Sequence, residues 1–307
     1  MSEPAPMDVV CLGVHVLDVL VRPVEEIPEG QGGALVEQIR LTAAGTAGGT
    51  ALILARLGAR VRSVGAIGTD AAGDMLLDLL RREGVDTTHL KRRDDVQTSA
   101  SVLPIRPDGS RPAFHVIGAN GTVTAADAPS DAAGFVHLGG PEFMGGEEAG
   151  RVLAAAAERG ATTSADVLAE GNPGLLDWIA PAFAALDYLL PNEEQVLGLT
   201  GGSDLEAGCR ALRERGVGCV AATRGADGVL LVDDDGARTI PALAIEPVDT
   251  TGCGDAFSAG FLRGLSLGRS RDDAARLGCA VASLVAQGLG TDAGDYDLAA
   301  ALALAPA

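Results

Sequence analysis

Short strand-like runs alternate with helix-length segments along almost the whole chain. The runs include "DVVCLGV", "RVRSVGAIG" and "GFVHLGG", and helix-length segments such as "GDMLLDLLRREG" and "EEAGRVLAAAAERG" lie between or after them. This alternation is typical of a mostly parallel sheet that is covered by helices on both faces. Several of the helix-length segments end in a glycine suited to a left-handed helix C-terminus: Gly58, Gly84, Gly160 and Gly216. The predicted fold class is therefore α/β, with three layers ordered α/β/α.

Two insertions interrupt the alternation. Residues 22–41 combine proline and glycine with a strand-like run, and residues 99–117 contain two such runs around an Asp108-Gly109 turn. A chain of 307 residues fits one large domain better than several small ones. We expect a single domain over residues 1–307, with a small β lid formed by about 22–41 and 99–117.

Charge and cysteine usage exclude several classes of protein. The chain has 42 acidic and 23 basic residues, and a net charge of −19 repels nucleic acids and anionic membranes. Its five cysteines are odd in number and form no C-x-x-C pair, which disfavours a disulfide framework or a zinc site. The N-terminus lacks the basic and apolar regions of a secretion signal, and no apolar run reaches the length of a membrane helix. We expect a soluble, cytoplasmic protein with a small-molecule partner.

The stretch "VDTTGCGDAFSAGF" carries the clearest chemical signal. If a helix follows the glycines, the amides of Cys253, Gly254 and Asp255 lie at its N-terminus and can hold an anion. Asp255 could then accept a proton from a substrate hydroxyl. A plain glycine-rich turn with Asp255 as a cap is the alternative. A dinucleotide-binding fingerprint is weak, because Phe257 stands where its last glycine should be.

Four segments together resemble one known family. "DTTGCGD" is similar to the D-T-x-G-[AC]-G-D signature of the ribokinase-like carbohydrate kinases, the PfkB family. "AATRGADGVLLV" resembles the family's T-x-G-x-x-G loop, "YLLPNEEQVLGLTG" its N-x-x-E segment, and residues 58–87 its early β-α unit. The likeness runs from about Met7 to Thr291 in the family's order. It implies a ribokinase-like kinase, and the chain has no P-loop.

The resemblance implies a role for each part of the glycine-rich stretch. By this likeness Asp255 is the catalytic base of an ATP-dependent phosphotransferase. The amides of Gly252, Cys253 and Gly254, with that of Asp255, would hold the γ-phosphoryl group during its transfer to a substrate hydroxyl.

The cofactors implied by the resemblance are ATP, Mg²⁺ and K⁺. The expected nucleotide contacts lie in two segments: Asn192, Thr223, Gly225 and Gly228. The expected potassium ligands are Asp249 and Thr251. Gln195 stands where the family's N-x-x-E segment has a glutamate often tied to the Mg²⁺ water shell, which puts metal handling in doubt, although Glu194 is adjacent. Asn192 as a plain helix cap is the alternative.

The expected acceptor contacts depart from those of a true ribokinase. They are Asp18, Gly45, Gly49 and Asn120. Gly49 replaces the family's usual asparagine, Thr46 replaces the ribokinase lysine, and Val16 replaces a ribokinase asparagine. A turn role is the alternative for Asp18 and for Asn120. Asp166 ends a strand-like run, where it could bind a ligand or cap a helix.

These observations leave three functions open. A sugar kinase is preferred over a nucleoside kinase, because aromatic residues are only 3% of the chain and Phe114 is the best lid candidate for a base shelf. A phosphosugar acceptor would need basic residues, for which Arg40 and Arg106 are candidates without forming a cluster. A catalytically silent binding protein is disfavoured by the retained Asp255 and its flanking glycines. We also expect a homodimer joined through the lids, since their apolar faces need cover.

Overall fold

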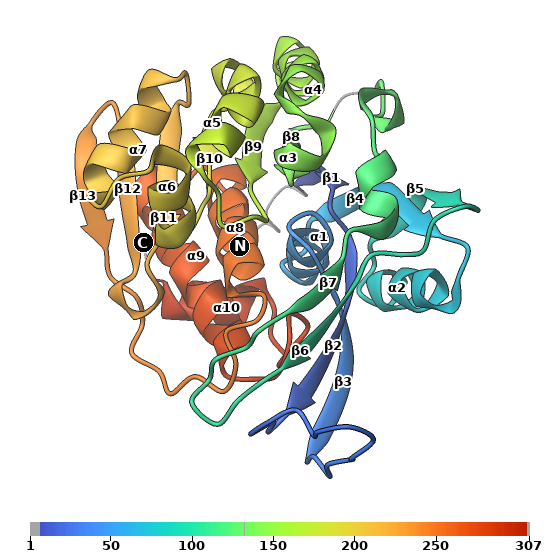
Figure 1. The fold of residues 1–307 in the computed structure, drawn as a ribbon. Coiled ribbons are helices and arrows are strands. Elements are labelled where there is room, and N and C mark those ends of the chain that lie inside the picture. The colour runs from blue at the N-terminus through green and yellow to red at the C-terminus, as the bar shows by residue number, and fades with distance from the viewer. Residues whose placement is uncertain (1–6, 132, 306–307) are drawn as a thin grey trace.

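The computed structural model describes residues 7–131 and 133–305, and within them a nine-stranded sheet crosses the centre of the molecule (Figure 1). Its strands are, in spatial order, β13 (Gly236–Ile240), β12 (Val229–Asp233), β11 (Cys219–Thr223), β10 (Tyr188–Leu189), β9 (Thr162–Asp166), β8 (Phe135–Gly139), β1 (Asp8–Gly13), β4 (Arg60–Gly68) and β5 (Asp86–Arg93). Neighbouring strands are parallel from β5 to β11, and the last two pairings are antiparallel. The mostly parallel sheet confirms the predicted fold class.

Helices cover both faces of this sheet. One face carries α1 (Gly48–Arg56), α2 (Ala71–Arg82), α8 (Cys253–Ser266), α9 (Arg271–Ala286) and α10 (Leu298–Leu304). The other carries α4 (Gly146–Glu158), α5 (Pro173–Ile179), α6 (Glu193–Thr200) and α7 (Leu205–Glu214), with the short α3 (Pro141–Met144) nearby. Single 3-10 turns are η1 (Gly118–Thr122), η2 (Ala125–Asp127), η3 (Ala180–Ala185) and η4 (Gly225–Asp227). The four glycines expected after helices all have positive φ, between 76° and 117°.

Small residues let α8 and α9 pack closely. A Cβ atom on Gly260 would lie 2.8 Å from the Cα of Gly278, and one on Gly264 would lie 2.7 Å from the Cα of Ala274. These distances are shorter than any ordinary carbon contact, so side chains larger than hydrogen would separate the helices. The close approach of α8 and α9 therefore depends on small residues at these positions.

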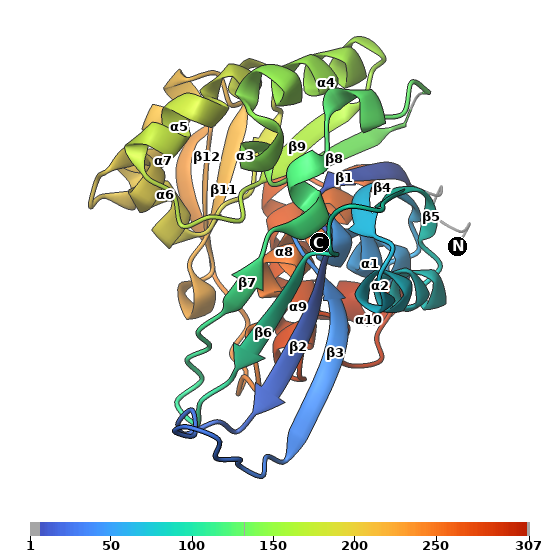
Figure 2. The same cartoon turned by 45° about the vertical axis from the view of Figure 1, so that its right-hand side comes forward.

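A separate four-stranded sheet projects from one edge of the described structure (Figure 2). Its order is β3 (Gln38–Ala44), β2 (Val16–Arg22), β6 (Ala100–Pro104) and β7 (Phe114–Val116). We call this sheet the lid. The strand of the first insertion begins at Gln38, later than the strand-like run suggested. β2, which precedes the predicted insertion, also belongs to the lid because the chain leaves the central sheet after Gly13.

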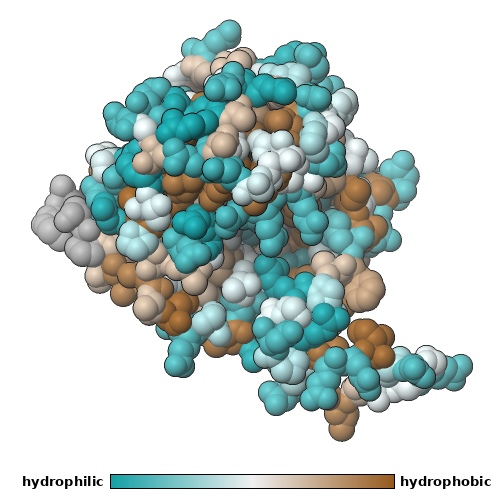
Figure 3. Space-filling model, turned by 60° about the vertical axis from the view of Figure 1, so that its left-hand side comes forward, coloured by the Kyte–Doolittle hydropathy of each residue, from teal (hydrophilic) through white to brown (hydrophobic). Residues whose placement is uncertain are grey.

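The two faces of the lid differ in character. Asp18 pairs with Thr42 and Ser101 on the face turned toward the central domain, where all three side chains are buried. The alternate positions point outward, and Phe114, which pairs with Val102, is 62% exposed. Figure 3 shows apolar side chains on this projecting part of the surface. Phe114 therefore lies on the face opposite Asp18 and cannot form a shelf above an acceptor held by that carboxylate in the same chain.

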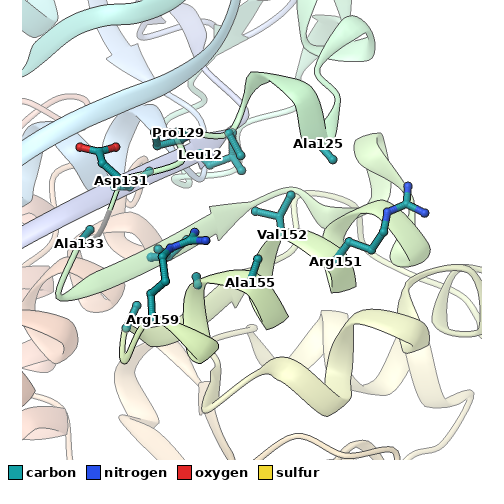
Figure 4. A pocket seen from close by; sticks show the side chains of 14 residues that line it. Leu12, Ala125, Pro129, Asp131, Ala133, Arg151, Val152, Ala155 and Arg159 are labelled. Atoms are coloured by element: carbon teal, nitrogen blue, oxygen red, sulfur yellow. The ribbon is translucent and has the colours of Figure 1, made fainter.

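A cavity of about 320 Å³ lies between α4 and the sheet, on the face away from α8 (Figure 4). Leu12 and Val152 line its apolar wall, and Arg151 of α4 and Arg159, which follows α4, lie at its edge. Among residues 7–131 and 133–305, no helix combines the length and the apolar character needed to cross a membrane.

Candidate active site

The N-terminus of α8 presents free backbone amides to an open space. Gly252 precedes the helix with φ of 79°, and a Cβ there would lie 2.6 Å from Thr291 Oγ1, so this turn requires glycine. A Cβ on Gly254 would meet nothing within 4 Å, which leaves room in front of the first turn. The Cys253 amide, which was expected to take part in anion binding, instead donates to Thr250 O at 3.2 Å. Within the described residues the amides of Gly252, Gly254 and Asp255 have no such acceptor, and together with the helix dipole they favour an anion at this point.

A pocket of about 450 Å³ extends from these amides along α9. Thr223, Gly225 and Gly228 line one side, while Thr250, Cys253 and Gly254 line the end next to α8. The wall from α9 consists of small side chains: Cys279, Ala282, Ser283 and Ala286. Gly228 has φ of 85°, and a Cβ there would lie 2.1 Å from Ile240 O. The loop expected to bind nucleotide and the expected anion site thus border one volume.

The thiol of Cys253 points toward α9. Its Sγ lies 3.7 Å from Ala282 O on α9, and burial raises the pKa of the thiol to about 12. An un-ionised thiol is a poor nucleophile. The Cys253 thiol is therefore not expected to react with a substrate.

Asn192 and Gln195 form a reciprocal cap at the start of α6. Asn192 Oδ1 accepts from Gln195 N at 2.8 Å, and Gln195 Oε1 accepts from Asn192 N at 2.8 Å. Gln195 Nε2 also donates to Val167 O at 2.7 Å. Both polar ends of Gln195 are therefore committed to the backbone. Asn192 still lies beside the pocket, since it pairs with Thr223 in an isolated bridge.

Asp255 lies directly against Gly49 of α1. A Cβ atom on Gly49 would be 2.1 Å from Asp255 Oδ2, so the carboxylate fills the space that a side chain at position 49 would need. Burial and the charge of Asp18 raise the pKa of Asp255 to about 8, and Arg111 opposes this shift. Gly49 and Asp255, two expected site residues that are far apart in sequence, are thus in contact at the N-terminus of α8.

Other carboxylates gather around Asp255. Burial raises the pKa of Asp18 to about 6. Asp166, at the end of β9, is 5% exposed, and its burial together with the charges of Asp255 and Glu142 raises its pKa well above the usual value. Glu142 Oε1 accepts from Leu168 N and Ala169 N, while Oε2 is buried without a hydrogen-bond partner among the described residues. The site concentrates negative charge that only cations or protons can relieve.

Asp249 and Thr251 lie on the other side of the α8 loop. Asp249 Oδ1 accepts from the backbone and hydroxyl of Thr251 at 3.1 and 2.9 Å, and Oδ2 accepts from Gly290 N at 3.0 Å. Thr291 Oγ1 is fully buried and has no partner within the described part of the chain. A carboxylate next to an unpartnered buried hydroxyl is a donor set that suits a monovalent cation.

The two remaining expected acceptor residues have clear structural tasks. Gly45 has φ of 91°, and a Cβ there would lie 2.7 Å from Val14 O, so it permits the turn into α1. Asn120 Oδ1 accepts from His15 N at 3.1 Å, and Asn120 Nδ2 donates to His15 O at 3.0 Å. The Asn120 amide is thus engaged in holding the segment that leads into β2.

The histidines and cysteines show no metal centre. His15 and His137 are buried and hydrogen-bonded to the protein, and burial lowers the pKa of each to about 4. Over residues 7–131 and 133–305, no group of three or more His, Cys, Asp or Glu side chains is arranged to hold a metal ion. A divalent ion at this site would need oxygen atoms from a ligand as well.

Comparison with known proteins decides the family. Residues 7–297 match the pfkB family carbohydrate kinases. The chain belongs to the PfkB family. It is 29% identical to a nucleoside kinase of Methanothermobacter thermautotrophicus, over 95% of this chain and 92% of that protein. It is also 29% identical to a ribokinase of Haemophilus influenzae, over 76% of this chain and 78% of that protein.

A solved fructokinase of Vibrio cholerae, with fructose, ADP and a calcium ion bound, superimposes with a TM-score of 0.81 at 25% identity. The superposition covers 97% of this chain and 99% of the fructokinase. This PfkB protein therefore has the ribokinase-like fold predicted from its motifs, with a large sheet and a separate small one.

Sequence reasoning missed three residues of this PfkB site. Arg111 reaches Thr250 from the lid, Glu142 lies near Asp166, and Phe143 packs against Val14, Val16 and Ala44. Arg111 follows a turn signal, and the other two residues follow a strand end. A turn or a strand end predicts the local structure of these residues, but it does not show which residues from other segments they contact.

Proposed function

We propose that this PfkB protein transfers the γ-phosphoryl group of ATP to a hydroxyl of a small sugar or sugar-like acceptor. The observation that carries the proposal is the position of Asp255. Its carboxylate belongs to the first turn of α8, whose amides border the 450 Å³ pocket, and the charge of Asp18 on the inner face of the lid reaches it. One carboxylate is thus placed between a donor site and an acceptor site.

Asp255 acts as the general base in this proposal. Its pKa of about 8 lies near neutral pH, where a base combines a sufficient deprotonated fraction with proton affinity. It takes the proton of the acceptor hydroxyl as the hydroxyl oxygen bonds to the γ-phosphorus. The amides of Gly252, Gly254 and Asp255 hold the phosphoryl oxygens, and the ADP oxygen leaves with the electron pair.

The proposed nucleotide site is the pocket beside α9. ADP in the solved fructokinase relative supports a nucleotide donor, and Thr223, Gly225 and Gly228 line this pocket next to Asn192. The small side chains of α9 leave space for a flat adenine ring. We assign the triphosphate to the end bordered by Cys253 and Gly254, because the free amides are there.

Two cations fit the residues present. Mg²⁺ brought with ATP would supply charge neutralisation between the phosphates. Since Gln195 is committed to the backbone, we propose that Asp166 and the free Oε2 of Glu142 face that ion. K⁺ would fit beside Asp249, Thr251 and the unpartnered hydroxyl of Thr291. Titration of Mn²⁺ followed by electron paramagnetic resonance should show weaker binding in Asp166→Asn. Equal affinity in the variant would exclude the divalent assignment.

A nucleoside is a second candidate acceptor, and a specific contact favours it. Phe143 and Val16 pack together at the base of the lid, and β-strand alternation puts Val16 on the same face as Asp18. This apolar wall could hold a base while Asp18 binds ribose hydroxyls. The similarity to a nucleoside kinase over 95% of the chain agrees with this alternative.

We also propose a homodimer formed through the outer faces of the lids in the cytoplasm. Several apolar residues are exposed on these strands: Ile39, Leu41, Val102, Phe114 and Val116. A two-fold interface would cover them, and a soluble metabolic kinase would work where ATP is present.

The test is an ADP-release assay with ATP against a panel of sugars and nucleosides. Turnover of one class with loss of about 10²- to 10⁴-fold in Asp255→Asn supports the proposal. A wild-type protein that binds sugars or nucleosides without turnover would instead be a silent binding protein. Gly225→Val should raise the KM for ATP more than that for the acceptor, and the reverse would move the nucleotide site elsewhere.

A further inference from the structure

Arg111 connects the lid to the loop in front of α8. It lies between β6 and β7, and its Nε donates a 3.2 Å hydrogen bond to Thr250 Oγ1, across 139 residues of sequence. Thr250 lines the end of the nucleotide pocket next to Cys253 and Gly254. In Figure 1 and Figure 2 the loop between β6 and β7 comes beside the segment that leads into α8. The guanidinium therefore stands at the boundary between the lid and the donor pocket.

The surroundings of Arg111 are acidic from several directions. Its charge lowers the pKa of Asp18 on β2 and of Asp255 on α8, and it acts on Cys253 in the same direction. Asp249 adds negative charge near Asp18. Arg40, a basic residue of β3, is paired with Asp292 at 3.1 Å. Arg111 thus brings a cation to a place where the acidic side chains alone would repel an incoming phosphate.

The observed contact leaves most of the guanidinium unused. A guanidinium has five N–H donors, and in the described part of the chain Arg111 uses one of them, for the neutral hydroxyl of Thr250. A long exposed side chain gains little from one such bond, because holding it costs conformational entropy. The remaining fork is suited to the planar, bidentate recognition of phosphoryl oxygens.

We propose that Arg111 is a further catalytic residue, which contacts the transferred phosphoryl group from the lid while the amides of α8 hold it from the opposite side. The proposal rests on the proposed kinase function. In the step it serves, the acceptor oxygen bonds to the γ-phosphorus, the bond to the bridging oxygen of ADP breaks, and Asp255 takes the proton. Arg111 neutralises charge on the phosphoryl oxygens, and the same contact holds the lid closed.

The test compares Arg111→Ala and Arg111→Lys with Arg210→Ala. Arg210 is exposed on α7, where it pairs with Glu206 at 2.6 Å, and it is not among the residues that line the pocket, so it controls for the loss of an arginine. With the acceptor found in the panel, we expect Arg111→Ala to lose about 10²- to 10³-fold in kcat, with both KM values within about three-fold of wild type. Arg111→Lys should recover part of the rate, and Arg210→Ala should retain it.

The pH profile gives a readout that a structural role would not move. Because Arg111 lowers the pKa of Asp255, its removal should shift the acid limb of kcat/KM to higher pH, while Arg111→Lys should keep it near the wild-type position. The charge of Arg111 acts on Asp18, Cys253 and Asp255, and Asp255 also interacts with the charges of Asp18 and Asp166.

Three outcomes would overturn the inference. One is a kcat within two-fold of wild type in Arg111→Ala with an unchanged melting temperature. Another is a raised KM for the acceptor with an unchanged kcat in Arg111→Ala, which would make Arg111 a recognition residue for an anionic acceptor. Absence of turnover by the wild-type protein would remove the proposed function and this inference with it, and is distinguishable because it precedes any variant.

Discussion

Replacing Gly49 with alanine should separate activity from stability in this protein. The added Cβ would lie 2.1 Å from Asp255 Oδ2, 2.7 Å from its Cγ and 3.1 Å from its Cβ. A comfortable contact needs about 3.5 Å, so the carboxylate must move by about 1 Å. A misplacement of that size typically lowers catalysis by about 10²-fold. The obstructing atoms are the end of a side chain, which can rotate without disturbing the backbone.

Gly49→Ala should lower kcat but should leave the stability of the fold unchanged or slightly higher. Gly49 lies in α1 with φ outside the positive range, where replacing glycine by alanine commonly gains about 0.5–1 kcal/mol. We expect kcat to fall about 10²-fold while the melting temperature stays level or rises. Gly202→Ala is the control, since its Cβ would meet only Thr200 Oγ1 at 3.6 Å.

The assay for Gly49→Ala is ADP release under saturating substrates, with thermal unfolding followed by circular dichroism. A kcat within three-fold of wild type would refute the reasoning, because the base would then work from a different position. A melting temperature lowered by more than 10 °C would also refute it, because the carboxylate would then be unable to move aside.

Three further predictions follow from the same geometry. kcat/KM should rise with pH through about 8, because a base with this pKa is only about one-tenth deprotonated at pH 7, and a profile that is flat from pH 6 to 9 would contradict the assignment of Asp255. Potassium should stimulate turnover more than sodium, and Asp249→Asn should abolish the difference, whereas equal rates of the wild-type protein with and without potassium would remove the cation site. Sedimentation velocity should show a dimer at micromolar concentration that Leu41→Asp converts into a monomer, and a wild-type monomer would exclude the lid interface.

Much of the fold was predictable because it depends on local patterns. The alternation of strand-like and helix-like runs predicted the α/β class, and the glycines after α1, α2, α4 and α7 follow from the left-handed backbone that ends a helix. The lid was predicted less well at its edges. The chain leaves the central sheet after Gly13 to form the strand Val16–Arg22, and one glycine inside a largely apolar run does not by itself predict a change of sheet.

The site was predictable where a motif carries its own geometry. Glycines at 252 and 254 and an acid at 255 describe a helix start and its neighbour, and α8 begins at Cys253. The contact of Gly49 with Asp255 and the reach of Arg111 to Thr250 depend on elements that lie far apart in sequence. Secondary-structure propensity does not predict contacts between segments that are distant in sequence. The sequence offered Asn192 as a helix cap, but it did not predict that Gln195 returns a hydrogen bond to the amide of Asn192.

Ionisation of the clustered carboxylates Asp18, Asp166 and Asp255 lowers the free energy of unfolding of the unliganded protein. Each has a pKa raised by burial, so ionising it costs folding free energy. For a carboxylate with a raised pKa, the group's contribution to stability is fully present below its pKa in the unfolded chain, near 4. This contribution is lost as the pH rises through about 6 for Asp18 and about 8 for Asp255. At the pH where the base becomes competent, the empty site is therefore electrostatically strained. Substrates that arrive with cations relieve that strain, so the enzyme should be most resistant to heat and proteases when it is occupied.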